Sequence, residues 1–467
     1  MPHPTPERPH GRDEIVETEV LILGGGLAGL AGGSLLGDRA TVLEAEPRPG
    51  GLVRTERVGA YWFDHVIHLL YFSHPSVEER IRGMLGETLR PCPPVAWVET
   101  AAGTTRFPVQ LHLAGLEPEA RAACLTDFAE AARADRADAA DYAELLLNAF
   151  GRTLCDLFFF PYNAKLWRRP LNELSASGFH WNLTRPGLAE VEHGADPARP
   201  VTAPYNARGW YPRPSGPGRR GMEVLSEALA GRVADLRLRH TVEHIDPERR
   251  LVRARTPEGP VHFHYTRECL STLPLPTTVE RCASAPADLV AACRELPRNR
   301  VRSVALAVRG PRPAGTGHWR YYTRADVPFT RLVFMTEFDP AMAPADGWGV
   351  LAEVVERSGE PAVSDAELTA RVLRGVRAVG MLDEGEVVES RVFHADPGYV
   401  VFTPAAQAVT ERALGFLAER GLTALGRYGS WTYSSMSQVM ESAFAWAEGL
   451  GGAPAARPPA ATAPAAP

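Results

Sequence analysis

The chain has few of the features that mark secreted, membrane-spanning or nucleic-acid-binding proteins. It has six cysteines in 467 residues, and none stands in a C-x-x-C pair or at metal-ligand spacing, so they read as buried small residues. No apolar run approaches the roughly 18 residues of a membrane-spanning helix. The net charge is −6, without a lysine or arginine block. We therefore expect no metal, no integral membrane segment and no nucleic-acid partner.

Both ends of the chain are also poor in apolar residues. The first residues, MPHPTPERPHGRDE, lack the apolar core of a signal peptide, which predicts a cytoplasmic protein. Residues 451–467 are almost all glycine, alanine and proline, and we expect disordered tails at 1–13 and 451–467. The oligomeric state stays open.

Glycine, in contrast, is concentrated where it carries information. Residues 20–44 read VLILGGGLAGLAGGSLLGDRATVLE. An apolar strand, a G-x-G-x-x-G turn, a helix-spaced segment, a second strand and the acid Glu44 follow one another, which predicts a dinucleotide site. An ordinary glycine turn in an α/β domain is the alternative. The cofactor-binding residues predicted in this unit are Gly24, Gly26, Leu27, Ala28, Gly29 and Glu44.

Each of these glycines, and the acid that follows them, has a physical task. Gly24 permits the tight turn, Gly26 lets the backbone approach a pyrophosphate at a helix N-terminus, and Gly29 lets helix and strand pack closely. Glu44 can accept hydrogen bonds from ribose hydroxyls.

A second glycine pair follows directly. Glu44 is followed by Gly50, Gly51 and Arg54, and this run resembles the E-x-x-x-x-x-G-G-x-x-x-R/T segment of two-dinucleotide-binding flavoproteins. The resemblance implies that Gly50, Gly51 and Arg54 also bind the cofactor and that the cofactor is FAD. NAD(P)H would then serve only as an external reductant.

The pattern of periodicity along the chain predicts an α/β protein with two interleaved domains. We expect a Rossmann-like FAD/NAD(P)-binding domain from the discontinuous segments 14–75, 208–298 and 395–450. A substrate domain would be formed by 76–207, which reads as helical, and 299–394, whose strands predict an antiparallel sheet.

Three further motifs stand outside the glycine unit. In PYNAKLW, Tyr162, Lys165 and Trp167 could contact a substrate, Trp167 by stacking on a base and Lys165 by meeting a phosphate. Core packing is the alternative. Tyr211 lies in a glycine-rich segment before a helix, where a plain loop-to-helix turn is the alternative. GRYGSWTYSSM precedes a helix whose N-terminal amides suit a flavin edge, so Ser435 and Met436, together with Val242, complete the predicted cofactor set.

Together these motifs resemble the UDP-galactopyranose mutase-like flavoproteins, within the amine oxidase and protoporphyrinogen oxidase superfamily. The resemblance runs from about 18 to 448 and rests on GGGLAGL, the E…GG…R run, FDHVIHLLYF, PYNAKLW with PLNEL, YNARGWYP and GRYGSWTYSSM. PYNAKLW and GRYGSWTY are its narrowest motifs.

The resemblance implies roles for individual residues. Arg427 and Tyr433 would bind a sugar-nucleotide diphosphate, with Arg309 as a second arginine, although a solvated Arg309 at a strand end is the alternative. His68 takes the position of a histidine beside the flavin, unless His65 is the match.

The same run also departs from the family. Val66 and Ile67 replace the glycine pair that precedes this histidine, and such bulk could reshape the pocket.

We thus expect an FAD-dependent oxidoreductase acting on a small polar substrate, with a sugar or sugar nucleotide of a biosynthetic pathway as the expected class. The alternative is a redox-neutral pyranose–furanose mutase, in which the resemblance implies reduced FAD N5 as nucleophile. Val66-Ile67, and Asn299 near the place expected for a mutase-type tyrosine, favour the redox reaction. A non-catalytic FAD-binding protein is a third possibility.

Overall fold

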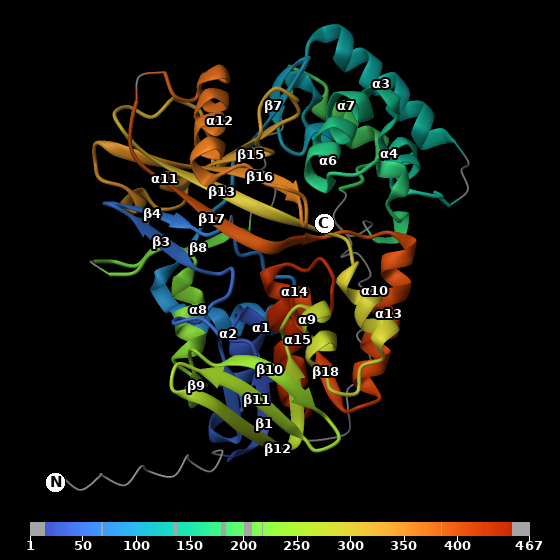
Figure 1. The fold of residues 1–467 in the computed structure, drawn as a ribbon. Coiled ribbons are helices and arrows are strands. Elements are labelled where there is room, and N and C mark those ends of the chain that lie inside the picture. Colours follow the sequence, from blue (N-terminus) through green and yellow to red (C-terminus); the bar gives the residue numbers. More distant parts are fainter. Residues whose placement is uncertain are drawn as a thin grey trace, which may run out of the picture.

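The computed structural model describes residues 15–66, 69–134, 138–178, 184–199, 208–216, 218–383 and 385–450. Two seven-stranded sheets organise this part of the chain (Figure 1). The first is mainly parallel, with the order β10-β11-β12-β1-β2-β9, and β18 pairs with β12. Its strands are β1 (Ile15–Leu23), β2 (Ala40–Leu43), β9 (Asp235–Arg237), β10 (Thr241–Asp246), β11 (Leu251–Thr256), β12 (Gly259–Ser271) and β18 (Leu422–Ala424).

Helices cover both faces of this sheet because β1 is apolar on both sides. Val20 and Ile22 pack toward one group of helices, and Leu21 and Leu23 toward the other. The first group is α1 (Leu27–Gly33), α2 (Pro75–Leu85), α8 (Glu223–Ala230) and α15 (Met436–Gly449). The second group is α9 (Leu275–Arg281), α10 (Ala287–Arg294) and α13 (Pro404–Ala418). This layering confirms the predicted Rossmann-like α/β architecture.

The second sheet has the order β17-β13-β16-β15-β14-β6-β7 and is antiparallel apart from the β14–β6 pair. Its strands are β6 (Ala96–Thr100), β7 (Gly103–Arg106), β13 (Arg298–Arg309), β14 (Trp319–Tyr322), β15 (Arg331–Phe334), β16 (Gly347–Arg357) and β17 (Glu386–Val400). Helix α12 (Asp365–Ala378) covers one face, and α11 (Met335–Phe338) follows β15.

A helical group packs against the other face of the second sheet, where Val301 and Tyr399 join its core. It consists of α3 (Pro118–Arg133), α4 (Tyr142–Phe150), α5 (Arg152–Leu154), the π-helical turn η5 (Cys155–Phe159), α6 (Phe160–Trp167) and α7 (Leu188–Gly194). The segment 76–207 is therefore helical only in part. Strands β5 (Leu89–Pro91), β6 and β7 interrupt it. Strands β5 and β6 pair with strands from distant parts of the chain, and β7 pairs with β6.

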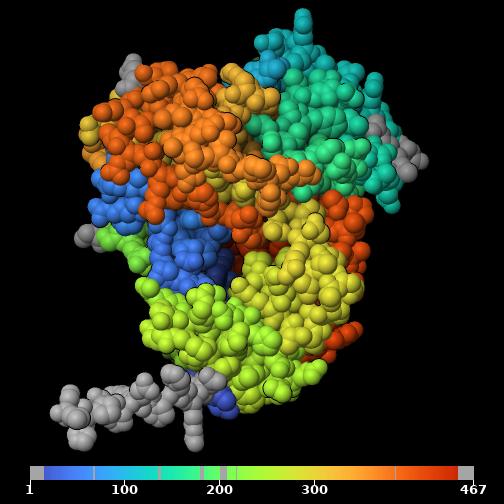
Figure 2. All heavy atoms as spheres, viewed as in Figure 1, coloured from blue at the N-terminus to red at the C-terminus, as the bar shows by residue number. Residues whose placement is uncertain are grey.

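Short elements lie at the junction of the two sheets: β3 (Thr55–Val58), β4 (Tyr61–Asp64), β8 (Trp210–Pro212) and α14 (Gly426–Gly429). Figure 2 shows a hollow in this region, with N-terminal and C-terminal atoms at its floor. The predicted domain boundaries stay predictions, and β17 runs across the boundary placed at 394/395.

Two predictions from composition can be compared with the structure. All six cysteines are buried and unpaired, which confirms that they serve as small core residues. Across the described ranges, no helix has both the length and the hydrophobicity to cross a bilayer.

Candidate cofactor and substrate site

The two predicted glycine turns meet in the structure. The amide of Gly50 donates a hydrogen bond to the carbonyl of Gly25 at 2.8 Å, and Gly26 and Gly50 form a parallel bridge. Gly24 and Gly51 have φ values of 104° and 58°, which favour glycine. The first and the second glycine turn therefore line one backbone surface beside the N-terminus of α1.

Gly26 and Gly29 differ in what a side chain would meet. A Cβ at Gly29 would overlap the carbonyl oxygen of Gly24, so Gly29 is required by the packing of helix on turn. A Cβ at Gly26 would have as its nearest protein atom the Cα of Gly51, at 3.9 Å. Space is thus kept free above Gly26, at a helix N-terminus, which is the arrangement that a pyrophosphate needs.

Glu44 and Arg54 flank this space. One oxygen of the Glu44 carboxylate accepts from the amide of Gly25 and the other from the amide of Glu46, both at 2.8 Å. Burial raises the pKa of Glu44, and the two amide donors oppose that shift. The Nε of Arg54 donates to the carbonyl of Gly51 at 2.6 Å. These residues therefore hold the turns in place and fit the predicted cofactor site.

Segments distant in sequence close the same region. In α14, a Cβ at Gly426 would lie 2.9 Å from Cβ of Ala28, the second residue of α1. Ser435 caps α15 by accepting from the amide of Gln438 at 3.3 Å, so α15 begins at Met436, the last residue of the motif expected to precede the helix. Val242 lies on β10, two residues after His240, whose amide donates to the carbonyl of Glu44 at 2.8 Å.

Next to the glycine turns lies a cluster of tyrosines around two arginines, which we call the tyrosine–arginine cluster. Its members are Tyr162, Tyr321, Arg331, Glu353, Tyr399, Arg427 and Tyr433. Leu52, which follows the second glycine pair, and Val66 pack against the same core as Tyr162, Tyr321 and Tyr433. The structure thus brings three predicted substrate residues, Tyr162, Arg427 and Tyr433, to the cofactor region.

Arg427 lies among aromatic rings. Its guanidinium carbon is 4.0 Å from the ring centre of Tyr433 and 5.5 Å from that of Tyr399. Its terminal nitrogens reach the carbonyls of Ser434 and Gly398 at 3.4 and 3.5 Å, and its buried Nε has no partner among the described residues.

The sequence reasoning missed the other arginine of the cluster. Arg331 on β15 donates from Nε and Nη2 to one oxygen of Glu353, at 3.1 and 2.6 Å, and the second Glu353 oxygen accepts from the Tyr399 hydroxyl at 3.1 Å. Burial alone would lower the pKa of Arg331, but the Glu353 carboxylate holds it well above its ordinary value. The available signals were an arginine at the start of the apolar strand RLVF and a glutamate within the apolar run of GWGVLAEVV.

Two predicted substrate residues have structural tasks instead. Lys165 donates to the carbonyls of Tyr322, Arg324 and Phe329, at 3.2, 2.9 and 2.6 Å, which uses all three N–H bonds of its ammonium. It is therefore not available for a phosphate. Trp167 is 1% exposed and donates from its indole to the Asn163 side chain at 2.9 Å, so it cannot stack on a base.

Tyr211 also lies in the core. It is fully buried, and its hydroxyl donates to Asp64 at 2.6 Å. Asp64 accepts as well from the hydroxyl of Thr55 at 2.7 Å and the amide of Met222 at 3.0 Å. Burial raises the pKa of Asp64 to about 6, and these hydrogen bonds act against the shift. Tyr211 therefore ties β8 to Asp64 of β4, which in turn holds the start of α8, and Tyr211 does not face a substrate.

Arg309 is not brought together with Arg427. It lies at the far end of β13, is exposed, and forms an ion pair of 3.3 Å with Glu386. Arg427 reaches β17 at Gly398, which packs on Val301 of β13. Eight strand residues, about 26 Å, separate Val301 from Arg309. The predicted two-arginine arrangement is wrong for Arg309, because the apolar strand runs away from the site.

The histidine position can be followed only in part. His68 and Ile67 lie outside the described residues. His65, the alternative, stacks on Phe393 and bonds through Nε2 to the carbonyl of His394 at 2.9 Å, on the side of β17. Val66, in contrast, packs against the core that holds the tyrosine–arginine cluster, so the bulk that replaces glycine is directed toward the predicted substrate region.

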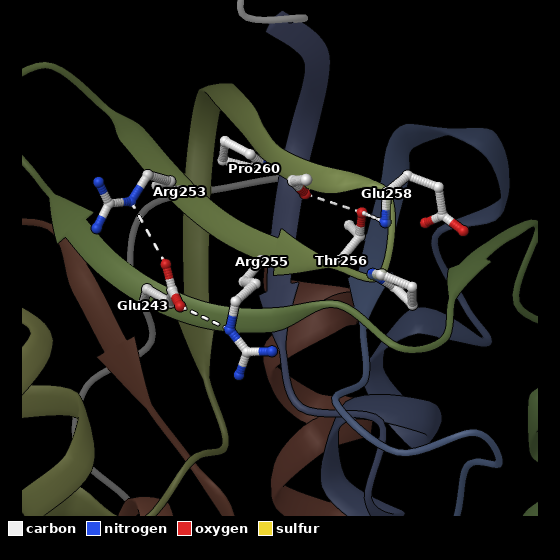
Figure 3. Close-up of a pocket in the computed structure, with 8 residues that line it drawn as sticks. Glu243, Arg253, Arg255, Thr256, Glu258 and Pro260 are labelled. Atoms are coloured by element: carbon white, nitrogen blue, oxygen red, sulfur yellow. Dashed lines mark hydrogen bonds and ion pairs between the residues drawn. The ribbon is translucent and has the colours of Figure 1, made fainter.

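A separate surface depression of about 450 Å³ lies at the β11–β12 hairpin (Figure 3). Glu243 stands there between Arg253 and Arg255, with ion pairs of 3.7 and 2.8 Å. These charges neutralise one another, and none of the predicted site residues lines the depression. The glycine turns and the tyrosine–arginine cluster are therefore the better candidate site.

Comparisons with known proteins agree with this fold. A solved structure of a reduced UDP-galactopyranose mutase superposes with a TM-score of 0.83 over 93% of this chain and 95% of that one, at 19% identity. A putative protoporphyrinogen oxidase from Exiguobacterium sp. 255-15 gives a TM-score of 0.69 over 93% and 98%, also at 19% identity. Putrescine oxidase bound to putrescine gives 0.58 over 93% and 99%, at 14% identity. At such identities these likenesses establish the fold.

The paired glycine turns, the acid after the second strand and the α/β layers define a dinucleotide-binding flavoprotein architecture. Residues 27–445 match the family described as flavin-containing amine oxidoreductase, and the chain belongs to that family. It is a flavin-dependent enzyme of the amine oxidase superfamily, with a fold like that of the UDP-galactopyranose mutase.

Proposed function

We propose that this protein is an FAD-dependent oxidoreductase that acts on a small polar substrate bound at the tyrosine–arginine cluster. The observation that carries the proposal is the free space above Gly26, next to Gly51 at the N-terminus of α1, with the cluster packed beside Leu52. One end of this region fits the pyrophosphate of a dinucleotide, and the other offers aromatic faces and an arginine to a substrate.

Specific residues would hold FAD. The amides at the start of α1 would face the pyrophosphate, and the Glu44 carboxylate would meet ribose hydroxyls. The start of α15 at Met436 would supply positive dipole ends near the flavin ring. When bound, FAD supplies a ring that accepts two electrons from a substrate or, once reduced, can act as a nucleophile.

The protein's contribution to the reaction is orientation and exclusion of water. Tyr162 and Tyr433 offer ring faces on which a substrate ring can rest, and Arg427 can meet its anionic or polar group. Val66 fills space where the related family has glycine, which favours net oxidation of a small substrate over the handling of a large sugar nucleotide.

An anaerobic spectral titration tests the proposal. The oxidised holoenzyme is mixed with candidate alcohols, amines, sugars and sugar nucleotides, and flavin absorbance is followed before and after an electron acceptor is added. We expect a true substrate to bleach the flavin and the acceptor to restore its colour. Turnover only by enzyme that was reduced beforehand, without net change in absorbance, would contradict net oxidation.

A redox-neutral sugar-nucleotide mutase is the second candidate, supported by the meeting of Arg427, Tyr433 and Tyr162 in one cluster. In that case NAD(P)H or dithionite would be needed only to reduce the flavin, and the product would be an isomer of the substrate. Product analysis of pre-reduced enzyme incubated with sugar nucleotides separates the two candidates.

A further inference from the structure

We infer that the substrate is a ring-shaped molecule with a single negative charge, that Arg427 binds this charge, and that Glu353 sets the preference by neutralising Arg331. The inference rests on the proposed function and names the substrate class of its site. It departs from the nucleotide diphosphate that the sequence resemblance implied, since such a ligand carries at least two negative charges.

Within the tyrosine–arginine cluster, the positive charge of Arg331 is neutralised by Glu353. Arg331 donates two hydrogen bonds to one oxygen of Glu353. The second Glu353 oxygen accepts hydrogen bonds from the hydroxyls of Tyr399 and Thr330, at 3.1 and 3.3 Å. The side chains of Arg331 and Glu353 are 15% and 4% exposed. A pair this buried and this well bonded acts on a nearby ligand as a dipole rather than as a full positive charge.

Arg427 supplies the positive charge of the cluster. Apart from two long contacts to carbonyl oxygens, its neighbours are the rings of Tyr399, Tyr428 and Tyr433, and no carboxylate forms an ion pair with it among the described residues. Its positive charge is thus met by the rings and hydroxyls of tyrosines and by no carboxylate, and its buried Nε has no partner among the described residues. One uncompensated charge fits one anionic group on a ligand.

The tyrosine rings of the cluster determine the shape of the ligand that fits it. Tyr399 and Tyr433 are parallel, with ring centres 6.0 Å apart and planes inclined by 11°, and Tyr321 meets Tyr162 edge to face at 5.2 Å. Tyr162, Tyr321 and Tyr433 each keep part of their surface accessible. One face of Tyr433 is stacked on Tyr399 and one face of Tyr162 on Phe158. The remaining ring faces around the cation favour a ligand that is itself a ring.

The test is a calorimetric titration of the holoenzyme with three probes of defined charge: benzoate, isophthalate and UDP. Benzoate and isophthalate share a ring and differ by one carboxylate. We expect benzoate to bind at least tenfold more tightly than isophthalate, and UDP to bind no better than isophthalate. Tighter binding of isophthalate or UDP by the wild-type protein would overturn the inference without any variant.

Two matched variants locate the cause. Glu353→Gln frees the charge of Arg331 and should shift the benzoate-to-isophthalate affinity ratio about tenfold toward the dianion. Glu356→Gln makes the same change three residues along β16, where Glu356 pairs with Arg302 at 2.6 Å, and should leave the ratio unchanged. An unchanged ratio in Glu353→Gln, or an equal shift in both variants, would refute the role of Glu353.

Binding of FAD is measured separately from binding of the probes. Flavin content is measured by absorbance in each preparation, and the titrations are repeated on protein stripped of flavin. Protein that binds no FAD would defeat the proposed function, whereas the probe ranking still reports the charge of the cluster. If Glu353→Gln fails to fold, Arg427→Ala provides the second variant: it should abolish the preference for benzoate, and an intact preference would contradict the inference.

Discussion

The glycines at positions 26 and 29 allow a sharp test of where the cofactor lies, because the same substitution should act in two different ways. At Gly29 an alanine Cβ would lie far inside the 3.0 Å that real Cβ atoms keep from backbone atoms, so α1 must move by about 1 Å. Overpacking of this kind costs about 1–3 kcal/mol or more in the free energy of unfolding, and Gly29→Ala should lower the Tm of the flavin-free protein.

At Gly26 the expected effect is on the cofactor alone. The residue has φ −76° and ψ −177°, which alanine adopts freely, and its Cβ has 3.9 Å to the nearest protein atom. Gly26→Ala should therefore keep the Tm of the flavin-free protein. Its methyl group would occupy the space assigned to the pyrophosphate, so FAD affinity should fall at least tenfold, which is about 1.4 kcal/mol.

The assay is reconstitution of flavin-free protein with FAD, followed by flavin fluorescence, with thermal unfolding measured before and after. FAD should raise the Tm of the wild type, since it binds only the folded state, and much less that of Gly26→Ala. Gly26→Ala protein with wild-type FAD affinity would refute the placement. Loss of stability equal to that of Gly29→Ala would mean that the space above Gly26 belongs to the protein's own packing.

Three further outcomes are expected. Arg427→Ala should weaken benzoate binding at least tenfold, and Arg427→Lys should restore it only in part because an ammonium lacks the planar fork; near-normal binding by the alanine variant would count against the anion role. Lys165→Met should lower the free energy of unfolding by about 3 kcal/mol while leaving FAD and benzoate affinities unchanged, since its carbonyl partners lose their donor. Because folding raises the pKa of Asp64 from 3.8 to about 6, the folded state keeps the proton of Asp64 between these pH values and the unfolded state does not. This group therefore makes the free energy of unfolding fall by about 3 kcal/mol as the pH rises from about 4 to 6. Urea titrations across this range should show a shallower fall for Asp64→Asn, and an equal fall would reject the assignment.

The parts of the site that could be predicted from the sequence are those whose geometry is local. Gly24, Gly26 and Gly29 lie on one strand–turn–helix unit, so their spacing alone fixes their relation. The second glycine pair could be placed because Glu44 and Gly51 are only seven residues apart. The fold class followed for the same reason, since apolar strands buried on both faces and helices between them leave few architectures.

The rest depended on which distant segments meet. Arg331 and Glu353 face each other only because β15 and β16 pair in one register, and no spacing in the chain reveals it. In α6 the motif PYNAKLW has the right residue types, but a helix turns about 100° per residue. Trp167, five residues after Tyr162, therefore turns to the core. Lys165 lies only about 60° around the helix from Tyr162, but three backbone carbonyls occupy its ammonium.

The pairing of the two chain ends has a consequence for synthesis. Helix α1 lies against α15, where a Cβ at Gly32 would stand 3.1 Å from the Trp446 ring, and β18 joins the sheet that β1 began. Roughly 400 residues separate these partners, which at 5–20 residues per second is about 20–80 s on the ribosome. During that time the face of α1 that packs on α15 lacks this partner, although β1, β2 and α8 are already made. A truncation before α15 should therefore leave this face of α1 exposed and yield protein that is insoluble and colourless.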